Sequence, residues 1–250
     1  MEWDIWVIVR ALVTPLHTVI EFGARFGTSS CVLADATANS GRVVSVEVDA
    51  SVYEHLMHNR ELHRCNFHVV QGSVASTRLV RAGHGKLHSG YAFTMKSVDH
   101  SNRSSTVPNL RFTEVEDATK LRFDVAVVDC EACIGDVLGD GSGGVGTLVD
   151  QLDLIILELD GDHTAAHAQL YSSWTAKLLS RGFHRIWASQ DTMDVYAQWS
   201  QQLYYHVWQR AVPLAGASHL PRYNRSSCSE TRRRMNYTTA EIRCATSRGF

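Results

Sequence analysis

The sequence lacks both a long run of apolar residues and a strong excess of charge of either sign. The apolar run nearest the start is Ile5 to Val9, far short of the ~20 residues that a membrane-spanning helix needs, and no later run is better suited. The net charge of the 250 residues is -2, which argues against a dedicated nucleic-acid-binding protein. With 44% hydrophobic and 20% charged residues, the composition is typical of a globular protein with one sizeable core.

The beginning of the chain also lacks the positive charge of a secretory signal peptide. Glu2 and Asp4 stand where that charge would be. We therefore expect no signal peptide and a cytoplasmic location. Three Asn-x-Ser/Thr sequons, at Asn102, Asn224 and Asn236, would matter only in a chain that enters the secretory pathway.

Charge is unevenly distributed along the chain. Residues 213–250 contain seven Arg and two Glu, a net charge of +5, whereas the preceding residues carry -7. The alternation of apolar and polar segments also ends at Pro213. We interpret residues 1–212 as one acidic domain and residues 213–250 as a basic, poorly ordered tail.

The six cysteines are an even number, which permits disulfides, but the chain does not resemble a small disulfide-stapled scaffold. Cys130 and Cys133 form a CxxC, and no second CxxC completes a four-thiolate zinc site. A redox or zinc role would need a suitable structural context. The favoured interpretation is two small buried residues at the end of a strand.

Strand-like apolar runs alternate with helix-like segments, a pattern that predicts a parallel sheet covered by helices. One predicted helix has an apolar stripe of Tyr53, Leu56, Met57 and Leu62. The other predicted helices are an N-terminal helix that carries Trp3 and Trp6 and helices over 28–39 and 164–180. The predicted strands span 18–23, 42–48, 66–72, 123–129, 152–160, 183–188 and 204–210.

Two segments interrupt this alternation. Residues 73–109 are rich in Ser, Gly and His, with one strand-like piece at 91–95, and we interpret them as an insertion on the domain surface. Residues 135–146 hold six of the 17 glycines but no Gly-Lys-Ser/Thr. That loop is therefore predicted to be a surface connection and not a phosphate-binding P-loop.

The first strand, turn and helix contain the sequence Glu21-Phe-Gly-Ala-Arg-Phe-Gly27. An acid at a strand end followed by a glycine turn lets a ligand lie against the backbone and the helix N-terminus. Glu47 ends the next predicted strand, 24 residues after Gly23. In nucleotide-binding sheets an acid about 20 residues after the glycine turn binds the ribose hydroxyls, and we assign that role to Glu47.

A dinucleotide and S-adenosylmethionine compete for this arrangement. A dinucleotide needs a second glycine where this chain has Arg25. The four lysines form no Tyr-x-x-x-Lys pair for short-chain dehydrogenase chemistry. S-adenosylmethionine has no phosphate, and its two positive charges suit acids such as Glu21, so it is the favoured ligand over NAD.

These motifs resemble those of class I methyltransferases, and specifically of the FkbM family. The glycine turn is similar to the family's Asp-x-Gly-Ala-Asn-x-Gly, and Val46-Glu47-Val48 is similar to its Phe-Glu-Pro. The segment Tyr53-Glu-His-Leu-Met-His-Asn59 matches its Tyr-x-x-Leu-x-x-Asn, and Asp129-Cys-Glu-Ala132 resembles its Asp-x-Glu-Gly. Glu158 corresponds to the Glu of the family's fifth strand. The resemblance covers residues 18–190.

The resemblance implies a Rossmann-like α/β fold with a mostly parallel seven-stranded sheet and helices on both faces. It implies S-adenosylmethionine as cofactor and O-methylation of a sugar or other small-molecule hydroxyl. No motif specifies the acceptor or the oligomeric state. The predicted cofactor-binding residues are Glu21, Gly23, Ala24, Gly27, Glu47, Ser73 and Asp129.

Three departures from the family pattern support an alternative. Arg25 replaces Asn in the glycine turn, Ala132 replaces the signature glycine, and Ser73 stands where many methyltransferases have an acid that binds the adenine amine. The hydroxyl of Ser73 can accept that hydrogen bond, more weakly than a carboxylate. The alternative is a catalytically inactive methyltransferase-like binding module.

Transfer to a hydroxyl requires alignment of the acceptor and removal of its proton. The predicted base is Asp129 or Glu131, and the competing interpretation is that they cap the following helix. Both lie at the predicted carboxyl edge of the sheet, where open α/β folds bind ligands. Three further acids and a histidine are predicted at the same edge: Glu158, Asp160, Asp162 and His163. Because no spacing among these residues demands a metal, we assign no metal ligands.

Overall fold

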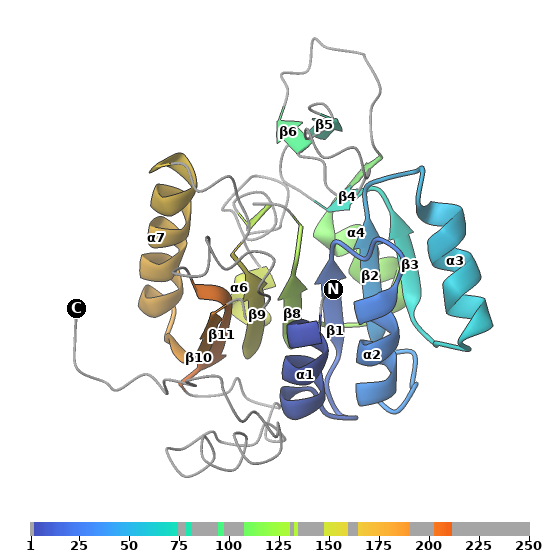
Figure 1. Cartoon of the computed structure of the whole chain (residues 1–250), viewed down its shortest axis with the longest axis horizontal. Helices are drawn as coiled ribbons and strands as arrows, with labels where there is room; N and C mark the ends of the chain where they lie inside the picture. Colours follow the sequence, from blue (N-terminus) through green and yellow to red (C-terminus); the bar gives the residue numbers. More distant parts are fainter. Residues whose placement is uncertain are drawn as a thin grey trace.

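The computed structural model describes residues 3–74, 79–81, 95–97, 108–130, 133–134, 148–159, 165–190 and 203–211. Its centre is a seven-stranded sheet with the order β10-β11-β9-β8-β1-β2-β3 (Figure 1). The strands are β1 (Val19–Phe22), β2 (Val43–Glu47), β3 (His68–Gln71), β8 (Val125–Val128), β9 (Leu154–Glu158), β10 (Phe183–Gln190) and β11 (Leu203–Arg210).

Most of the sheet is parallel. β1 pairs in parallel with β2 and β8, and β8 pairs in parallel with β9, whereas β11 is antiparallel to both of its neighbours. Every residue of β1, β2, β8 and β9 is buried, which is why these strands are continuous apolar runs in the sequence. The predicted α/β fold class is confirmed.

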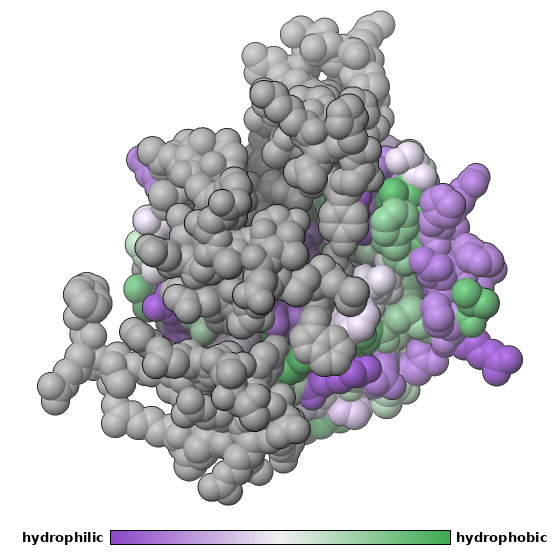
Figure 2. Space-filling view, in the orientation of Figure 1, coloured by the Kyte–Doolittle hydropathy of each residue, from purple (hydrophilic) through white to green (hydrophobic). Residues whose placement is uncertain are grey.

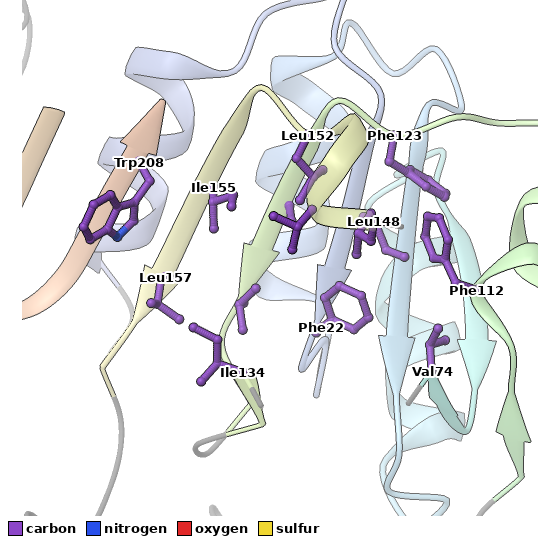
Figure 3. Packing of buried hydrophobic residues seen from close by; sticks show 14 of the residues in the cluster. Phe22, Val74, Phe112, Phe123, Ile134, Leu148, Leu152, Ile155, Leu157 and Trp208 are labelled. Carbon is purple, nitrogen blue, oxygen red and sulfur yellow. The ribbon is translucent and has the colours of Figure 1, made fainter. Parts of the chain in front are cut away.

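Helices cover both faces of the sheet. One face packs against α1 (Trp3–Leu12), α2 (Thr28–Ala36) and α3 (Tyr53–Leu62). The other packs against α4 (Phe112–Thr119), α6 (Leu148–Gln151) and α7 (Ala165–Ser180). Alternate side chains of each strand supply the two cores. Val19 lies in the first, and Phe22 lies in the second, which is shown in Figure 3.

The predicted apolar stripe of the third helix is partly wrong. In α3 only Leu56 is buried, and Leu62 is 63% exposed. Because α3 lies at the edge of the sheet beside β3 (Figure 1), little apolar surface is available to cover it. The surface over this helix, at the right of Figure 2, is accordingly hydrophilic.

Four short strands lie within and around the predicted insertion. β4 (Ser73–Val74) pairs in parallel with β7 (Asn109–Leu110), and β5 (Leu79–Arg81) pairs antiparallel with β6 (Met95–Ser97). β5 and β6 lie beyond the carboxyl edge of the parallel strands, above the sheet in Figure 1. Most of the strand-like piece at 91–95, the glycine-rich loop 135–146 and the tail 213–250 lie outside the described residues.

Two disulfides are present among the described cysteines. Cys31 of α2 is bonded to Cys65, and Cys130 is bonded to Cys133, with Cα–Cα distances of 5.3 Å and 5.4 Å. Cys130 and Cys133 follow the end of β8, as the expectation of two residues at a strand end had it, but they are half-buried instead of buried, and they are bonded to each other.

None of the helices in the described ranges is long and apolar enough to span a membrane.

Candidate functional site

A glycine turn joins the carboxyl end of β1 to the start of α2. The backbone N–H groups of Gly23 and Ala24 donate to the carbonyl of Val46 in β2, at 3.0 Å and 3.1 Å. Gly27 then donates to the carbonyl of Ala24 at 2.7 Å and precedes the first helical residue, Thr28. Gly23 and Gly27 have φ angles of 96° and 79°, which favour glycine because a Cβ is strained there. The motif thus builds a tight turn tied to β2.

Gly23 also permits a close approach between two strand ends. A Cβ at this position would lie 1.6 Å from the carbonyl oxygen of Asp129, so only glycine fits. The N–H of Asp129 donates to the carbonyl of Phe22 at 3.0 Å. The predicted cofactor residues Gly23 and Ala24 and the predicted base Asp129 are therefore neighbours, although about 100 residues separate them in the sequence.

Glu47 lies at the carboxyl end of β2 and is directed at the glycine turn. One of its carboxylate oxygens accepts the backbone N–H of Arg25 at 2.5 Å, and the other accepts the N–H of Asp49 at 2.6 Å. Burial raises the pKa of the Glu47 carboxyl, and the two backbone hydrogen bonds oppose that rise by favouring the charged form. Each oxygen keeps a further lone pair for another donor. The predicted ribose-binding acid is thus fixed in orientation beside the turn.

Glu21 lies beneath the turn and is only 1% exposed. Its Oε2 accepts the hydroxyl protons of Ser30 in α2 and Ser45 in β2, at 2.5 Å and 2.6 Å. These contacts join β1, β2 and α2 directly under the turn. Glu21 therefore joins the elements that form the turn, and its role in cofactor binding stays a prediction.

Arg25 is accommodated in the turn through its backbone. It has a φ of 46°, in the left-handed region where Asn is the commoner non-glycine residue. Its backbone N–H donates to the carboxylate of Glu47, and its guanidinium lies 5.6 Å from the centre of the Phe26 ring. Asn59, the last residue of the Tyr-x-x-Leu-x-x-Asn segment, donates to the carbonyl of Phe26 at 2.9 Å. The segment in α3 thus holds the turn in place.

Ser73 follows β3 and lies at the same edge as Glu47. The N–H of Gly72 donates to the carbonyl of Glu47, and the Ser73 side chain is 2% exposed. Its hydroxyl donates to Oδ1 of Asn109 at 2.8 Å. Asn109 is a polar residue at this position that the sequence analysis missed, because the two residues are 36 positions apart and no motif links them.

The carboxyl end of β9 contributes a further acid. Glu158 is 6% exposed, and its Oε1 accepts the hydroxyl of Tyr205 in β11 at 3.2 Å. Tyr205 was not among the predicted site residues, since it lies in an antiparallel strand with no sequence signal. Glu131, Asp160, Asp162 and His163 lie outside the described residues. In the part of the chain that is described, no group of three or more His, Cys, Asp or Glu side chains could hold a metal ion.

Known structures share this fold at low sequence identity. A protein described as a candidate rRNA methylase from Clostridium thermocellum aligns over 84% of this chain and 96% of its own, with 7% identity and a TM-score of 0.52. An O-methyltransferase from Bacillus cereus in complex with SAH aligns over 82% and 77%, with 11% identity and a TM-score of 0.48. TomG, an O-methyltransferase from Streptomyces achromogenes in complex with SAM, aligns over 82% and 76%, with 14% identity and a TM-score of 0.46.

The fold is therefore the Rossmann-like fold of class I methyltransferases, with its antiparallel strand β11 inserted between β9 and β10. No family model matches the sequence, and no curated protein matches it.

Proposed function

We propose that the chain is an S-adenosylmethionine-dependent methyltransferase that acts on a hydroxyl of a sugar or other small molecule. The observation that carries this proposal is the contact of Glu47 with the glycine turn. An acid at the end of the second strand, hydrogen-bonded to a turn between the first strand and its helix, is the arrangement that binds the nucleoside part of a cofactor. The O-methylation and the class of acceptor are proposed from the resemblance of the sequence motifs to those of the FkbM family.

The residues of the site divide the work of cofactor binding. Gly23 and Ala24 allow the nucleoside to lie close to the backbone, and the two oxygens of Glu47 accept the ribose hydroxyls. Ser73 lies where the adenine amine is expected, with Asn109 beside it. When bound, S-adenosylmethionine supplies a methyl group already activated by a sulfonium.

Asp129 is the proposed base. It follows β8 at the edge occupied by the glycine turn and is half-buried. A carboxylate there takes the proton of the acceptor hydroxyl as the oxygen attacks the methyl carbon. Glu131 is the second candidate from the same signature, and helix capping is the structural alternative for both.

Titration calorimetry of the full chain with S-adenosylmethionine and, separately, with NAD tests the proposal. We expect S-adenosylmethionine to bind and NAD not to bind. Binding of NAD alone would overturn the proposal in favour of an oxidoreductase. Binding of S-adenosylmethionine without transfer of a labelled methyl group to any of a panel of sugars and small alcohols would favour the inactive binding module.

Glu47→Ala should weaken S-adenosylmethionine binding at least tenfold. Paired hydrogen bonds from the ribose hydroxyls to a carboxylate are worth roughly 1.5–3 kcal/mol. Glu47→Gln removes the charge at nearly constant size and serves as the conservative comparison. Circular dichroism establishes that each variant is folded, and an unchanged dissociation constant in folded Glu47→Ala would remove Glu47 from the ribose site.

A further inference from the structure

The disulfide between Cys130 and Cys133 lies at the carboxyl end of β8. Only two residues separate the cysteines, and the N–H of Cys133 donates to the carbonyl of Cys130 at 3.3 Å, which closes a turn. Both side chains are half-buried against the core formed with α4, α6 and α7. The sulfurs are therefore neither at the centre of the core nor fully exposed.

This disulfide borders the glycine turn. A Cβ on Gly23 would lie 3.3 Å from the Cα of Cys130, as well as 1.6 Å from the carbonyl oxygen of Asp129. The backbone that enters the CxxC is thus in contact with the turn that we propose to hold the cofactor. A change in the covalent state of Cys130 and Cys133 alters the path allowed to the chain at this contact.

The two disulfides differ in the length of the chain segment that they enclose. The bond between Cys31 and Cys65 spans 34 positions and encloses all of β2 with Glu47, whereas the bond between Cys130 and Cys133 spans three. The constraint that a disulfide places on the unfolded chain grows with the length of the loop it closes. We therefore expect reduction of the Cys31–Cys65 bond to be coupled to unfolding, and reduction of the Cys130–Cys133 bond to be possible within the folded domain.

We propose that Cys130 and Cys133 form a thiol–disulfide exchange site that regulates cofactor binding at the glycine turn. The regulatory part rests on the proposed function of that turn. The reaction partner is a small thiol–disulfide couple such as glutathione.

The exchange proceeds in two displacement steps. The thiolate of one small thiol attacks one protein sulfur, which forms a mixed disulfide and releases the other cysteine as a thiolate. A second small thiolate attacks the small-molecule sulfur of the mixed disulfide and releases the remaining cysteine. Two electrons and two protons pass to the protein, which becomes a dithiol, and one small disulfide leaves. The reverse reaction reforms the bond, because the partner cysteine is only three positions away.

The first experiment equilibrates the full chain in glutathione buffers of graded composition, then alkylates free thiols and maps them by mass spectrometry. We expect Cys130 and Cys133 to convert between dithiol and disulfide in buffers that leave the bond between Cys31 and Cys65 intact and the circular dichroism unchanged. Reduction of both disulfides together, or reduction of Cys130 and Cys133 only upon unfolding, would overturn the exchange site.

The second experiment measures the dissociation constant of S-adenosylmethionine in the same buffers. We expect the oxidised and reduced forms to differ at least threefold. By linkage the cofactor then shifts the midpoint of the thiol–disulfide equilibrium by the same factor, where a tenfold difference corresponds to about 30 mV. The Cys130→Ser/Cys133→Ser variant should bind with one affinity in every buffer.

The outcomes separate the two proposals. Equal affinity in both redox states would overturn the regulation and leave the methyltransferase proposal standing. Absence of binding in both states would overturn the methyltransferase proposal and the regulation with it, while the exchange site would still be decided by the alkylation map.

Discussion

At the scale of single residues, the candidate site depends on buried acids that are held in place by hydrogen bonds. Glu47 keeps its carboxylate next to two backbone N–H groups, so the donors that orient it also oppose its protonation. Glu21 is held by two serine hydroxyls. The two acids of the motifs therefore differ in use: one faces the turn, and the other joins the elements beneath it.

Asp129→Asn should reduce methyl transfer by about 10²- to 10⁴-fold and leave cofactor affinity nearly unchanged. The asparagine keeps the size and most of the hydrogen bonding of Asp129 but cannot accept the proton of the acceptor. Turnover is measured with labelled S-adenosylmethionine and the acceptor that the panel identifies, and affinity is measured by calorimetry. Normal turnover would transfer the role to Glu131, and a variant that fails to fold would establish the helix-capping interpretation.

Asp124→Asn should stabilise the protein at pH 7.5 by about 1–3 kcal/mol. Burial, with a smaller contribution from the charge of Asp153, raises the pKa of the Asp124 carboxyl from 3.8 to about 6. The folded protein therefore binds this proton more tightly than the unfolded chain, and ionisation costs stability as the pH rises from 3.8 to about 6. Asparagine removes that cost, and its side-chain oxygen can still accept the N–H of Thr18, which lies 2.8 Å from Asp124 Oδ1.

Urea unfolding of both proteins between pH 4 and pH 8 measures this effect. The advantage of the variant should shrink as the pH falls below about 6, because Asp124 then becomes neutral in the folded protein. Asp117→Asn, at an exposed position of α4, is the matched control and should change little at any pH. An advantage of Asp124→Asn that does not depend on pH would contradict the ionisation argument.

At the scale of secondary-structure elements, the segment that runs from α2 to the end of α3 has its two ends joined to each other. The disulfide of Cys31 and Cys65 joins α2 to the residues after α3. Asn39 and Asn66 add hydrogen bonds at the same place, with the N–H of Asn66 donating to Oδ1 of Asn39 at 2.5 Å. Because β2 and Glu47 lie between these two links, the position of Glu47, the acid that we propose to bind the ribose, depends on them.

Cys31→Ser/Cys65→Ser should lower the free energy of unfolding by about 3–4 kcal/mol, the value expected for a loop of this length from the entropy of the unfolded chain. Urea unfolding without reductant measures it. Cys130→Ser/Cys133→Ser is the comparison and should cost less, because its loop is far shorter. An equal loss in the two variants would show that loop length does not govern their stabilities.

At the scale of the whole molecule, Arg210 joins several elements at the start of β9, at the edge of the sheet opposite the glycine turn. Its guanidinium donates to the carbonyls of Leu152, Val149 and Arg181, at 2.9 Å, 2.7 Å and 2.8 Å. It also lies 4.4 Å from the centre of the Phe183 ring. The first residue of β10, the last residue of β11, α6, and the residues just before β9 and just after α7 thus meet at one side chain.

Arg210→Ala should lower the free energy of unfolding by about 3–5 kcal/mol, because it removes these bonds and the cation 3.5 Å from the fully buried Asp153. Arg111→Ala breaks an ion pair whose side chains are 67% and 44% exposed, and should cost at most about 1 kcal/mol. Urea unfolding compares the two variants. A similar small loss in both would mean that Arg210 is not a junction of the fold.

Local features of the fold could be predicted from the sequence. Short-range patterns predict the turn from Glu21 to Gly27, the alternation of buried strands with helices, and the position of Glu47. Glycines in turns and apolar runs in buried strands are both recognisable within a few residues of sequence. α4 and α6 were missed, since the first lies next to the insertion and the second has four residues. The burial of the apolar stripe of α3 was overestimated, since the sequence of the helix does not show that it lies at the exposed edge of the sheet.

Contacts between segments that are distant in the sequence could not be predicted in this way and are seen in the folded chain. The pairing of Cys31 with Cys65, of Ser73 with Asn109, and of Glu158 with Tyr205 joins residues 34, 36 and 47 positions apart. The approach of Asp129 to Gly23 depends on β8 lying beside β1, a neighbour relation that strand order sets and that no local pattern contains. The candidate site lies where several strands end, so its acids can be identified from the sequence, but which of them lie close together depends on the order of the strands.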